Sequence, residues 1–115
     1  WAAARLDDLL NWIPARLSAV LIAATHHGLR GWQSIRRDAQ KHRSPNAGWP
    51  ESAMARGLGV AIAGPRAYDG QMRSFPFVNE HGRRDIGAND VDLACTALWR
   101  SWAVFVGITL LLALL

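Results

Sequence analysis

The chain is poor in cysteine and lacks the motifs that most directly indicate a metal or a nucleotide. Its one cysteine, Cys95, excludes an internal disulfide and any cluster of cysteine metal ligands. Because Cys95 lies in an apolar stretch, we expect a buried and unreactive thiol. The histidines do not show the i, i+4 spacing that favours zinc, and no Gly-x-x-x-x-Gly-Lys loop is present. Any nucleotide site must therefore be built in another way.

A signal peptide is also missing, because no charged start leads into a short apolar run with a small-residue cleavage site. The 115 residues suffice for one small domain. The chain starts at Trp1 instead of Met, and its first residues are typical of a helix interior, so we expect a fragment or a processed chain. Hydrophobic residues make up 50% of the chain. They concentrate at its two ends, with the polar residues between them.

The first apolar segment predicts two helices. Residues 1–10 are rich in Ala and Leu, and Asn11 is expected to cap a second helix with Pro14 in its first turn. We expect that second helix to run to about Leu29. A membrane span needs roughly 20 apolar residues, so this helix is marginal alone. It is interpreted as a span packed against other helices; a buried helix of a soluble bundle is the alternative.

The last apolar segment gives the strongest membrane signal. From Leu93 to Leu115 the only charged residue is Arg100, and a helix over this range would be about 34 Å long. That length is enough to cross a hydrocarbon core of roughly 30 Å. Trp99 and Trp102 beside Arg100 are typical of an interfacial belt with a snorkelling cation. Asp85 or Asn89 is expected to cap this helix.

The middle of the chain predicts short elements joined by turns. Ser34 is expected to cap a short basic helix that ends at Lys41, and Pro50 to begin another that ends at Arg56. Residues 60–63 are expected to be extended and residues 79–84 to form a polar loop. Turns or helix ends are expected at Gly57, Gly59, Gly64-Pro65 and Asp69-Gly70.

The middle is also basic, and the whole chain carries a net charge of +4. This charge admits a nucleic-acid surface, a phosphate-rich small ligand or a cytoplasmic loop of a membrane protein. The flanking segments favour the cytoplasmic loop, which is compatible with a phosphate ligand. Nucleic acid is disfavoured because no binding motif occurs and the aromatic residues do not alternate with the basic ones. The basic residues are Arg30, Arg36, Arg37, Lys41, Arg43, Arg56, Arg66, Arg73, Arg83 and Arg84.

The predicted fold class is therefore mainly α, as a fragment of a polytopic membrane protein. Residues 1–30 form its apolar, membrane-associated helical part. Residues 31–84 form a polar, loop-rich cytoplasmic segment with short helices. Residues 85–115 form the C-terminal helix, which spans the membrane from about residue 93.

Two groups of polar residues suggest chemistry. Asp7 and Asp8 are adjacent and cannot share a helix face, so one could bind a cation while the other caps, pairs or faces water. Magnesium is the natural ion, because it often binds one or two carboxylates together with substrate phosphates. The alternative is a solvated helix end.

The second group lies in the loop from Ser44 to Glu51. Asn46 supplies donors and acceptors, Gly48 allows close approach of the backbone, Trp49 offers a flat apolar face, and Glu51 is a potential base or metal ligand. The alternative is a structural turn with a buried tryptophan. The cations just before the loop suit phosphate, although solvated helix cations are the alternative. They are Arg36, Arg37, Lys41 and Arg43.

Three blocks of the chain resemble the CobD/CbiB family of cobalamin biosynthesis. Arg5 to Asp8 with Asn11 to Arg16 is similar to its Arg-Leu-Asp-Asp…Asn-x-x-Pro-Ala-Arg block. Asp38 to Gly59 is similar to its Asp…His-x-Ser-Pro-Asn-Ala-Gly-Trp-Pro-Glu block, with Arg56 where a small residue is expected. Gly64 to Gly70 is similar to Gly-Gly-Pro-x-x-Tyr-x-Gly, with Ala63 replacing the first Gly. Residues 74–81 depart from the family's usual loop.

The resemblance implies an adenosylcobinamide-phosphate synthase. This enzyme is a multi-pass protein of the inner (plasma) membrane that uses ATP to join adenosylcobyric acid to aminopropanol phosphate. The match is to the family's C-terminal part, so the N-terminal part of the same protein is an expected partner. Expected catalytic residues are Asp7, Asp8, Asn46 and Glu51, with magnesium on Asp7 and Asp8. Expected substrate- and phosphate-binding residues are Arg5, Lys41, His42, Arg43, Ser44, Gly48, Trp49 and Tyr68. A regulatory relative without ligase activity and an inactive fragment are the alternatives.

Overall fold

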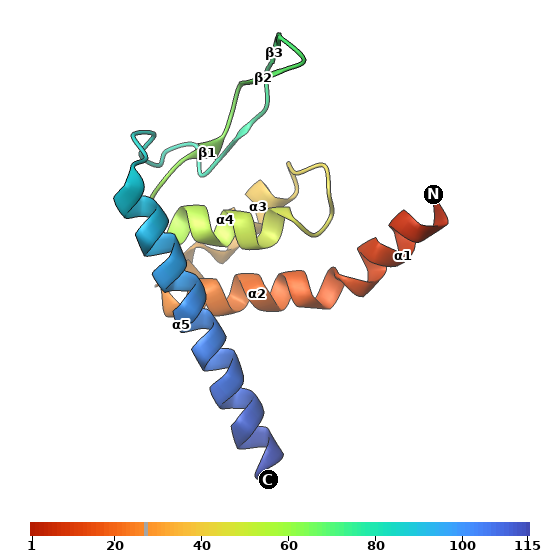
Figure 1. Ribbon diagram of the computed structural model, residues 1–115, viewed down its shortest axis with the longest axis vertical. Helices are drawn as coiled ribbons and strands as arrows, with labels where there is room; N and C mark the ends of the chain where they lie inside the picture. The colour runs from red at the N-terminus through yellow and green to blue at the C-terminus, as the bar shows by residue number, and fades with distance from the viewer. Residues whose placement is uncertain (27) are drawn as a thin grey trace.

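A computed structural model describes residues 1–26 and 28–115 (Figure 1). His27, one of the histidines considered for a metal, lies outside the described residues. Five α-helices, one short 3₁₀ helix and two small antiparallel strand pairs follow one another along these ranges. The helical segments are α1 (Ala2–Leu10), α2 (Trp12–Thr25), η1 (Gly28–Gly31), α3 (Trp32–Ala39), α4 (Gly48–Gly57) and α5 (Ala88–Ala113). The strands are β1 (Ile62–Ala63), β2 (Arg66–Tyr68), β3 (Gln71–Arg73) and β4 (Phe77–Val78).

Asn11 is the N-cap residue of α2, as predicted, but its side chain makes no capping hydrogen bond to that helix. Asn11 has helical dihedrals, and its Nδ2 donates back to the carbonyl oxygen and to Oδ1 of Asp7, at 3.1 and 2.9 Å. Its side chain therefore binds the end of α1. The sequence had suggested that it would bind the start of α2 instead. Pro14 lies in the first turn of α2, as predicted, where its missing N–H leaves no hydrogen bond unmade.

The helical core is built largely from small side chains on α2, α3 and α4. Ala19, Ile22, Ala23, Ile35 and Ala53 are buried together. Alanine at these positions lets the helices approach closely. At Gly48 an added Cβ would lie 2.6 Å from the carbonyl oxygen of Ala39, so glycine is required for α4 to pack against the end of α3. Trp32, Trp49 and Met54 pack against this core and cover it.

Several helix boundaries differ from the prediction. The second helix ends at Thr25, short of Leu29, and η1 follows it. The next helix begins at Trp32 with Gly31 as its N-cap, so Ser34 lies inside it, and it ends at Ala39, before Lys41. These observed helix ends lie two to four residues from the predicted ones.

Two further helix ends also move. Helix α4 begins at Gly48, with Pro50 in its first turn. Helix α5 has Gly87 as its N-cap, not Asp85 or Asn89. The carboxylate that accepts the exposed N–H of Gly87, at 2.9 Å, belongs to Asp90. Asp90 is also bound by the Arg83 guanidinium, and so ties the preceding loop to the start of α5.

The strands form two small ladders between α4 and α5. β1 pairs with β4, and β2 pairs with β3 in a hairpin that projects away from the helices (Figure 1). The predicted turn at Asp69-Gly70 closes this hairpin, with φ of 51° and 74°. Asp and Gly tolerate such positive φ values better than most residues. The predicted extended stretch at 60–63 contains β1.

Helix α5 crosses the end of α2 and then projects away from the rest of the molecule (Figure 1). Ala97 and Ser101 are buried at the crossing, where the hydroxyls of Ser101 and Thr25 lie 3.1 Å apart. Beyond the crossing most side chains are exposed. Cys95 is exposed as well, so the prediction of a buried thiol is wrong: the apolar stretch that suggested burial faces outward.

Among the described residues, α5 is the one helix long and apolar enough to cross a membrane by length and composition. Only 11% of its most hydrophobic window is buried, so it is not the packed core helix of a soluble bundle. Helix α2 has 14 residues, which is about 21 Å of helix and too short to cross alone. The chain is thus mainly helical with a single candidate span, and the predicted second span is not present among the described residues.

We expect the chain to fractionate with membranes, and Val104→Arg to weaken that association. Val104 is exposed near the middle of the apolar part of α5, where an arginine costs about 3 kcal/mol of insertion free energy. Resistance to alkaline extraction measures the effect. Gln33→Arg adds the same side chain at an exposed position of α3 and should extract like the wild type. Recovery of the wild-type chain as a soluble monomer without detergent would contradict the assignment.

Candidate functional site

The Asn46 side chain joins the loop before α4 to the first two helices. It is 6% exposed, and both of its polar atoms are hydrogen-bonded within the chain. Its Oδ1 accepts from Arg16 at 2.6 Å, and its Nδ2 donates to the carbonyl oxygen of Asp8 at 2.8 Å. The Ser44 hydroxyl accepts the backbone N–H groups of Asn46 and Ala47, each at 3.3 Å. Asn46 is therefore a clamp that holds the loop in place.

The Arg16 guanidinium supports the same loop from α2. It donates to the carbonyl oxygen of Pro45 at 3.1 Å in addition to Asn46. It also lies 4.6 Å from the ring centroid of Trp12 and 4.8 Å from that of Trp49. The other neighbour of the Trp49 ring is Trp32, with centroids 5.6 Å apart. One cation thus organises two tryptophans and the loop through cation–π contacts and hydrogen bonds.

A second clamp is centred on Asp38, at the end of α3. Its side chain is 5% exposed, and its two oxygens accept from Lys41 at 2.8 Å and from Arg56 at 2.9 Å. The backbone N–H of Asn79 adds a third bond at 3.0 Å. Burial by itself would raise the pKa of the Asp38 carboxyl, but the bonds from Lys41, Asn79 and Arg56 outweigh it and lower the pKa below 3.8. Arg56 therefore has a structural partner at the position where the family resemblance implied a small residue.

Two polar hollows lie near this loop, and their linings share no residue. The first, here called the Asp7 pocket, has a volume of about 350 Å³. The side chain of Asp7 contributes its one carboxylate, while Asp8 forms an ion pair with Arg5 at 3.6 Å and does not line it. The two aspartates diverge, as their adjacency on a helix requires. The lining residues are Asp7, Asn11, Pro14, Ala15, Ser18, Ser44, Asn46, Ala47 and Pro50.

The second hollow, here called the Glu51 pocket, is smaller, at about 110 Å³. It combines basic groups with the single carboxylate of Glu51. His42 links the two kinds of group: its Nδ1 accepts the Ser44 N–H at 3.0 Å, so its Nε2 carries the proton and faces Glu51 at 3.6 Å. The lining residues are Lys41, His42, Arg43, Glu51, Ala63, Arg66, Phe75, Pro76 and Val78.

The residues predicted for the site are thus divided between two pockets. Lys41, His42, Arg43 and Glu51 gather in one, and Asp7, Ser44 and Asn46 in the other. Five predicted residues line neither pocket, and Asp8, paired with Arg5, is one of them. Gly48 serves helix packing, and the Trp49 ring lies beside Arg16 and Trp32. Their substrate contacts stay predictions.

Tyr68 and Arg5 are the other two. Tyr68 is half-exposed on the hairpin, with its ring centroid 5.9 Å from that of Phe75. Arg5 is exposed on α1, beside Asp8. Sequence reasoning did not select three residues that organise the site, namely Arg16, Asp38 and Arg66. The first two stand within the blocks that resemble the family, which was a usable signal. Arg66 stands at an unspecified position of its block and gave none.

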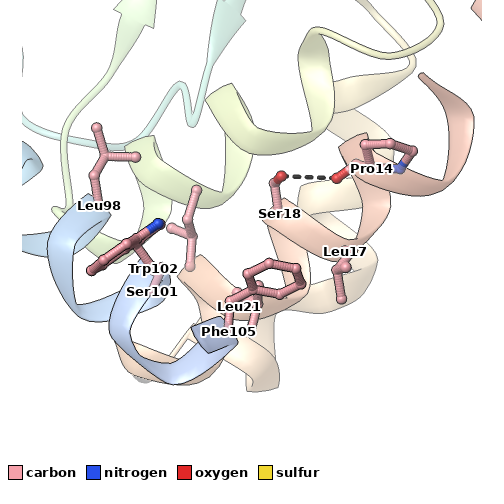
Figure 2. A pocket seen from close by; sticks show the side chains of 9 residues that line it. Pro14, Leu17, Ser18, Leu21, Leu98, Ser101, Trp102 and Phe105 are labelled. Atoms are coloured by element: carbon pink, nitrogen blue, oxygen red, sulfur yellow. Dashed lines mark hydrogen bonds between the residues drawn. The ribbon is translucent and has the colours of Figure 1, made fainter. Parts of the chain in front are cut away.

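A third hollow differs from both pockets because it is almost entirely apolar (Figure 2). It lies between α2 and α5 and has a volume of about 310 Å³. Its polar groups are chiefly Ser18, whose hydroxyl donates to the carbonyl oxygen of Pro14 at 2.8 Å, and Ser101. Leu17, Leu21, Leu98, Trp102 and Phe105 supply most of the remaining lining. No titratable side chain lines this groove, so it offers no acid–base chemistry.

Fold and site together describe a mainly helical chain with one candidate membrane span among its described residues and a segment rich in polar and cationic side chains. The family model described as CobD/Cbib protein matches residues 1–98. The chain therefore belongs to the CobD/CbiB family. No solved structure matches it.

Curated relatives agree with this assignment. The chain is 45% identical to the cobalamin biosynthesis protein CobD of Brucella anthropi, over 98% of this chain and 37% of that protein. It is 46% identical to the protein of the same name from Rhizobium meliloti, over 90% of this chain and 34% of that protein. A third relative of that name, from Rhodobacter capsulatus, is 50% identical over 69% of this chain and 26% of the relative. The chain spans about a third of the length of the curated relatives it matches.

We expect Asn46→Ala to destabilise the fold by about 2 kcal/mol, because the carbonyl oxygen of Asp8 loses its side-chain partner and Arg16 loses one of its hydrogen bonds. Thermal unfolding in detergent, followed by near-ultraviolet circular dichroism of the tryptophans, measures the change. Asn89→Ala removes the same side chain from an exposed position and should melt like the wild type. Equal melting temperatures for the two variants would show that the clamp contributes no stability.

We expect Asp38→Asn to cost about 3 kcal/mol of stability at neutral pH, because the partly buried Arg56 loses its counter-charge. The pKa of Asp38 is lowered on folding, so its contribution is complete above 3.8 and is lost as the pH falls through the lower folded value. As the pH is lowered through this range, the free energy of unfolding should therefore fall less steeply for Asp38→Asn than for the wild type. Asp69→Asn, in an exposed turn that tolerates asparagine, should keep the wild-type slope.

Proposed function

We propose that this chain forms part of the active site of a cobalamin-biosynthesis enzyme, an adenosylcobinamide-phosphate synthase. The reaction joins a carboxyl group of adenosylcobyric acid to aminopropanol phosphate in an amide, at the expense of ATP. The observation that carries the proposal is the Glu51 pocket, which collects cations and one carboxylate from separate segments of a chain of the CobD/CbiB family. The names of the relatives support the pathway, and the pocket's chemistry supports the reaction.

Amide formation from a carboxylate requires activation, for which a phosphoryl group is the natural choice. The substrate carboxylate attacks the γ-phosphorus of ATP, an acyl phosphate forms, and ADP leaves. The amine then attacks the acyl carbon, the C–N bond forms, and inorganic phosphate leaves with the electrons of the broken C–O bond. The amine must first lose a proton from its ammonium form. Glu51 is the one carboxylate in its pocket, and we assign it that proton.

The Asp7 pocket fits magnesium in its donor chemistry. It offers the carboxylate of Asp7 together with the hydroxyl oxygen of Ser18. One carboxylate is enough, because magnesium commonly completes its shell with water and substrate phosphates. When bound, the ion would neutralise phosphate charge. Asp7 would hold it, and Asn11, which donates to Asp7 Oδ1 at 2.9 Å, would orient the carboxylate.

The location follows from the same proposal. We propose a multi-pass protein of the plasma membrane in which α5 is one span and the rest of the full-length protein supplies others. The basic layer from Arg30 to Arg84 would face the cytoplasm, where ATP is found and where short loops carry excess Lys and Arg. No observation favours a purely regulatory relative over this enzyme.

We expect Asp7→Asn and Glu51→Gln, each in the full-length protein, to reduce amide formation about a hundredfold or more. Loss of a group that acts on developing charge commonly has an effect of that size, about 3 kcal/mol in the barrier. The measurement is product formation by the detergent-purified enzyme, together with its melting temperature. Both variants should insert and melt normally, since neither side chain is buried. Asp92→Asn, at an exposed position of α5, is the matched control.

Near-normal turnover in both variants, with wild-type melting, would overturn the proposed roles. Loss of turnover together with loss of the fold would assign both carboxylates to structure instead.

A further inference from the structure

The Glu51 pocket is too small for the larger substrates. Sites for drug-sized ligands commonly have roughly 300–1,000 Å³, whereas this pocket has about 110 Å³. A corrin or a whole nucleotide does not fit such a volume. A phosphate group on a short carbon chain is of the right size.

The cationic side chains that line the Glu51 pocket differ in whether they already have an ion-pair partner. Lys41 is already paired with Asp38 at 2.8 Å. Among the described residues, the guanidinium groups of Arg43 and Arg66 have no hydrogen-bond or ion-pair partner. Two such cations beside one small cavity create a positive potential that favours an anion. An arginine fork matches the oxygens of a phosphate particularly well.

Arg66 reaches the pocket from the β2–β3 hairpin, and aromatic rings hold it there. Its guanidinium lies 4.8 Å from the ring centroid of Phe75 and 5.6 Å from that of Tyr68. The rings also contact each other edge to face. Tyr68 does not line the pocket, but its ring helps to orient the Arg66 guanidinium.

Glu51 adds a carboxylate to this otherwise basic pocket. The Nε2–H of His42 faces one of its oxygens at 3.6 Å, and the carboxylate lines the same cavity as the cations. A ligand that complements this arrangement carries an anion at one end and a cation at the other. An alkyl phosphate that bears an ammonium group has both charges within a few bonds.

We propose that the Glu51 pocket binds the phosphorylated amine substrate, with its phosphate on Arg43 and Arg66 and its ammonium on Glu51. This inference rests on the proposed function and assigns to Arg66 a role in recognising the phosphate. His42 acts as a positioning residue for Glu51. ATP and the corrin carboxyl group approach from outside this pocket, and the separate Asp7 pocket, at about 350 Å³, has room for the phosphates of ATP.

The test uses the full-length protein in detergent and three related ligands. Aminopropanol phosphate carries both charges, propyl phosphate lacks the ammonium, and aminopropanol lacks the phosphate. Calorimetric titration should show that Arg66→Ala weakens binding of both phosphate ligands about tenfold or more, and leaves aminopropanol unchanged. Glu51→Gln should weaken only the two amines. Arg66→Lys should recover part of the phosphate affinity through its retained charge.

Arg73→Ala is the matched control, because Arg73 is the cross-strand partner of Arg66 on the same hairpin and does not line the pocket. It should bind all three ligands like the wild type. Equal effects of Arg66→Ala and Arg73→Ala, or an effect of Arg66→Ala on aminopropanol, would overturn the assignment. A melting temperature for each variant separates loss of the ligand contact from loss of the hairpin.

Failure of the pocket assignment and failure of the proposed function give different results. A wild-type protein that forms the amide, with an unchanged KM for aminopropanol phosphate in Arg66→Ala, would refute the pocket and retain the enzyme. A wild-type protein that shows the predicted pattern of binding but forms no amide would retain the pocket and refute the ligase.

Discussion

The polar segments between α3 and α5 depend on the hydrogen bonds and ion pairs of the Asp38 carboxylate. It receives Lys41 from the loop, Arg56 from α4 and the Asn79 backbone from the segment after β4. Because a buried carboxylate is costly without such donors, all three segments must arrive together. Asn79 continues the network by donating to the carbonyl oxygens of Ala55 and Val60, at 3.2 and 2.9 Å. The Glu51 pocket exists because this network sets its walls.

Arg16 fulfils the corresponding role for the other side of the loop. Its contacts with Asn46 and Trp49 fix the segment that separates the two pockets. The small core residues make these long-range contacts possible, since alanine and glycine let α3 and α4 lie close enough for short polar bridges. A chain with a larger core at Ala53 or Gly48 would move the loop and both hollows with it.

Local patterns predicted much of this fold but not its polar bridges. The apolar run after Leu93 and the Asp69-Gly70 turn were found because each depends on neighbouring residues alone. The predicted cap at Ser34 was wrong, and Asn11 is the N-cap residue of α2 without a side-chain bond to that helix, because the prediction used side-chain type alone. The role of Asp38 depends on Arg56 and Asn79, which lie far along the chain, and spacing does not reveal such partners. The family resemblance selected Glu51 and Lys41 together. It did not show that Asp7 would line a different pocket from theirs.

The hairpin that carries Arg66 is held by two three-residue strands around a turn at Asp69-Gly70, and all of its strand residues are exposed. So short a ladder contributes little stability of its own. The hairpin should therefore open locally at a lower free energy than the helical layer, and its amide protons should exchange with deuterium before those of α2 or α4. Local opening of the hairpin would move Arg66 away from the Glu51 pocket, so low stability here links entry of a small ligand to motion of the hairpin.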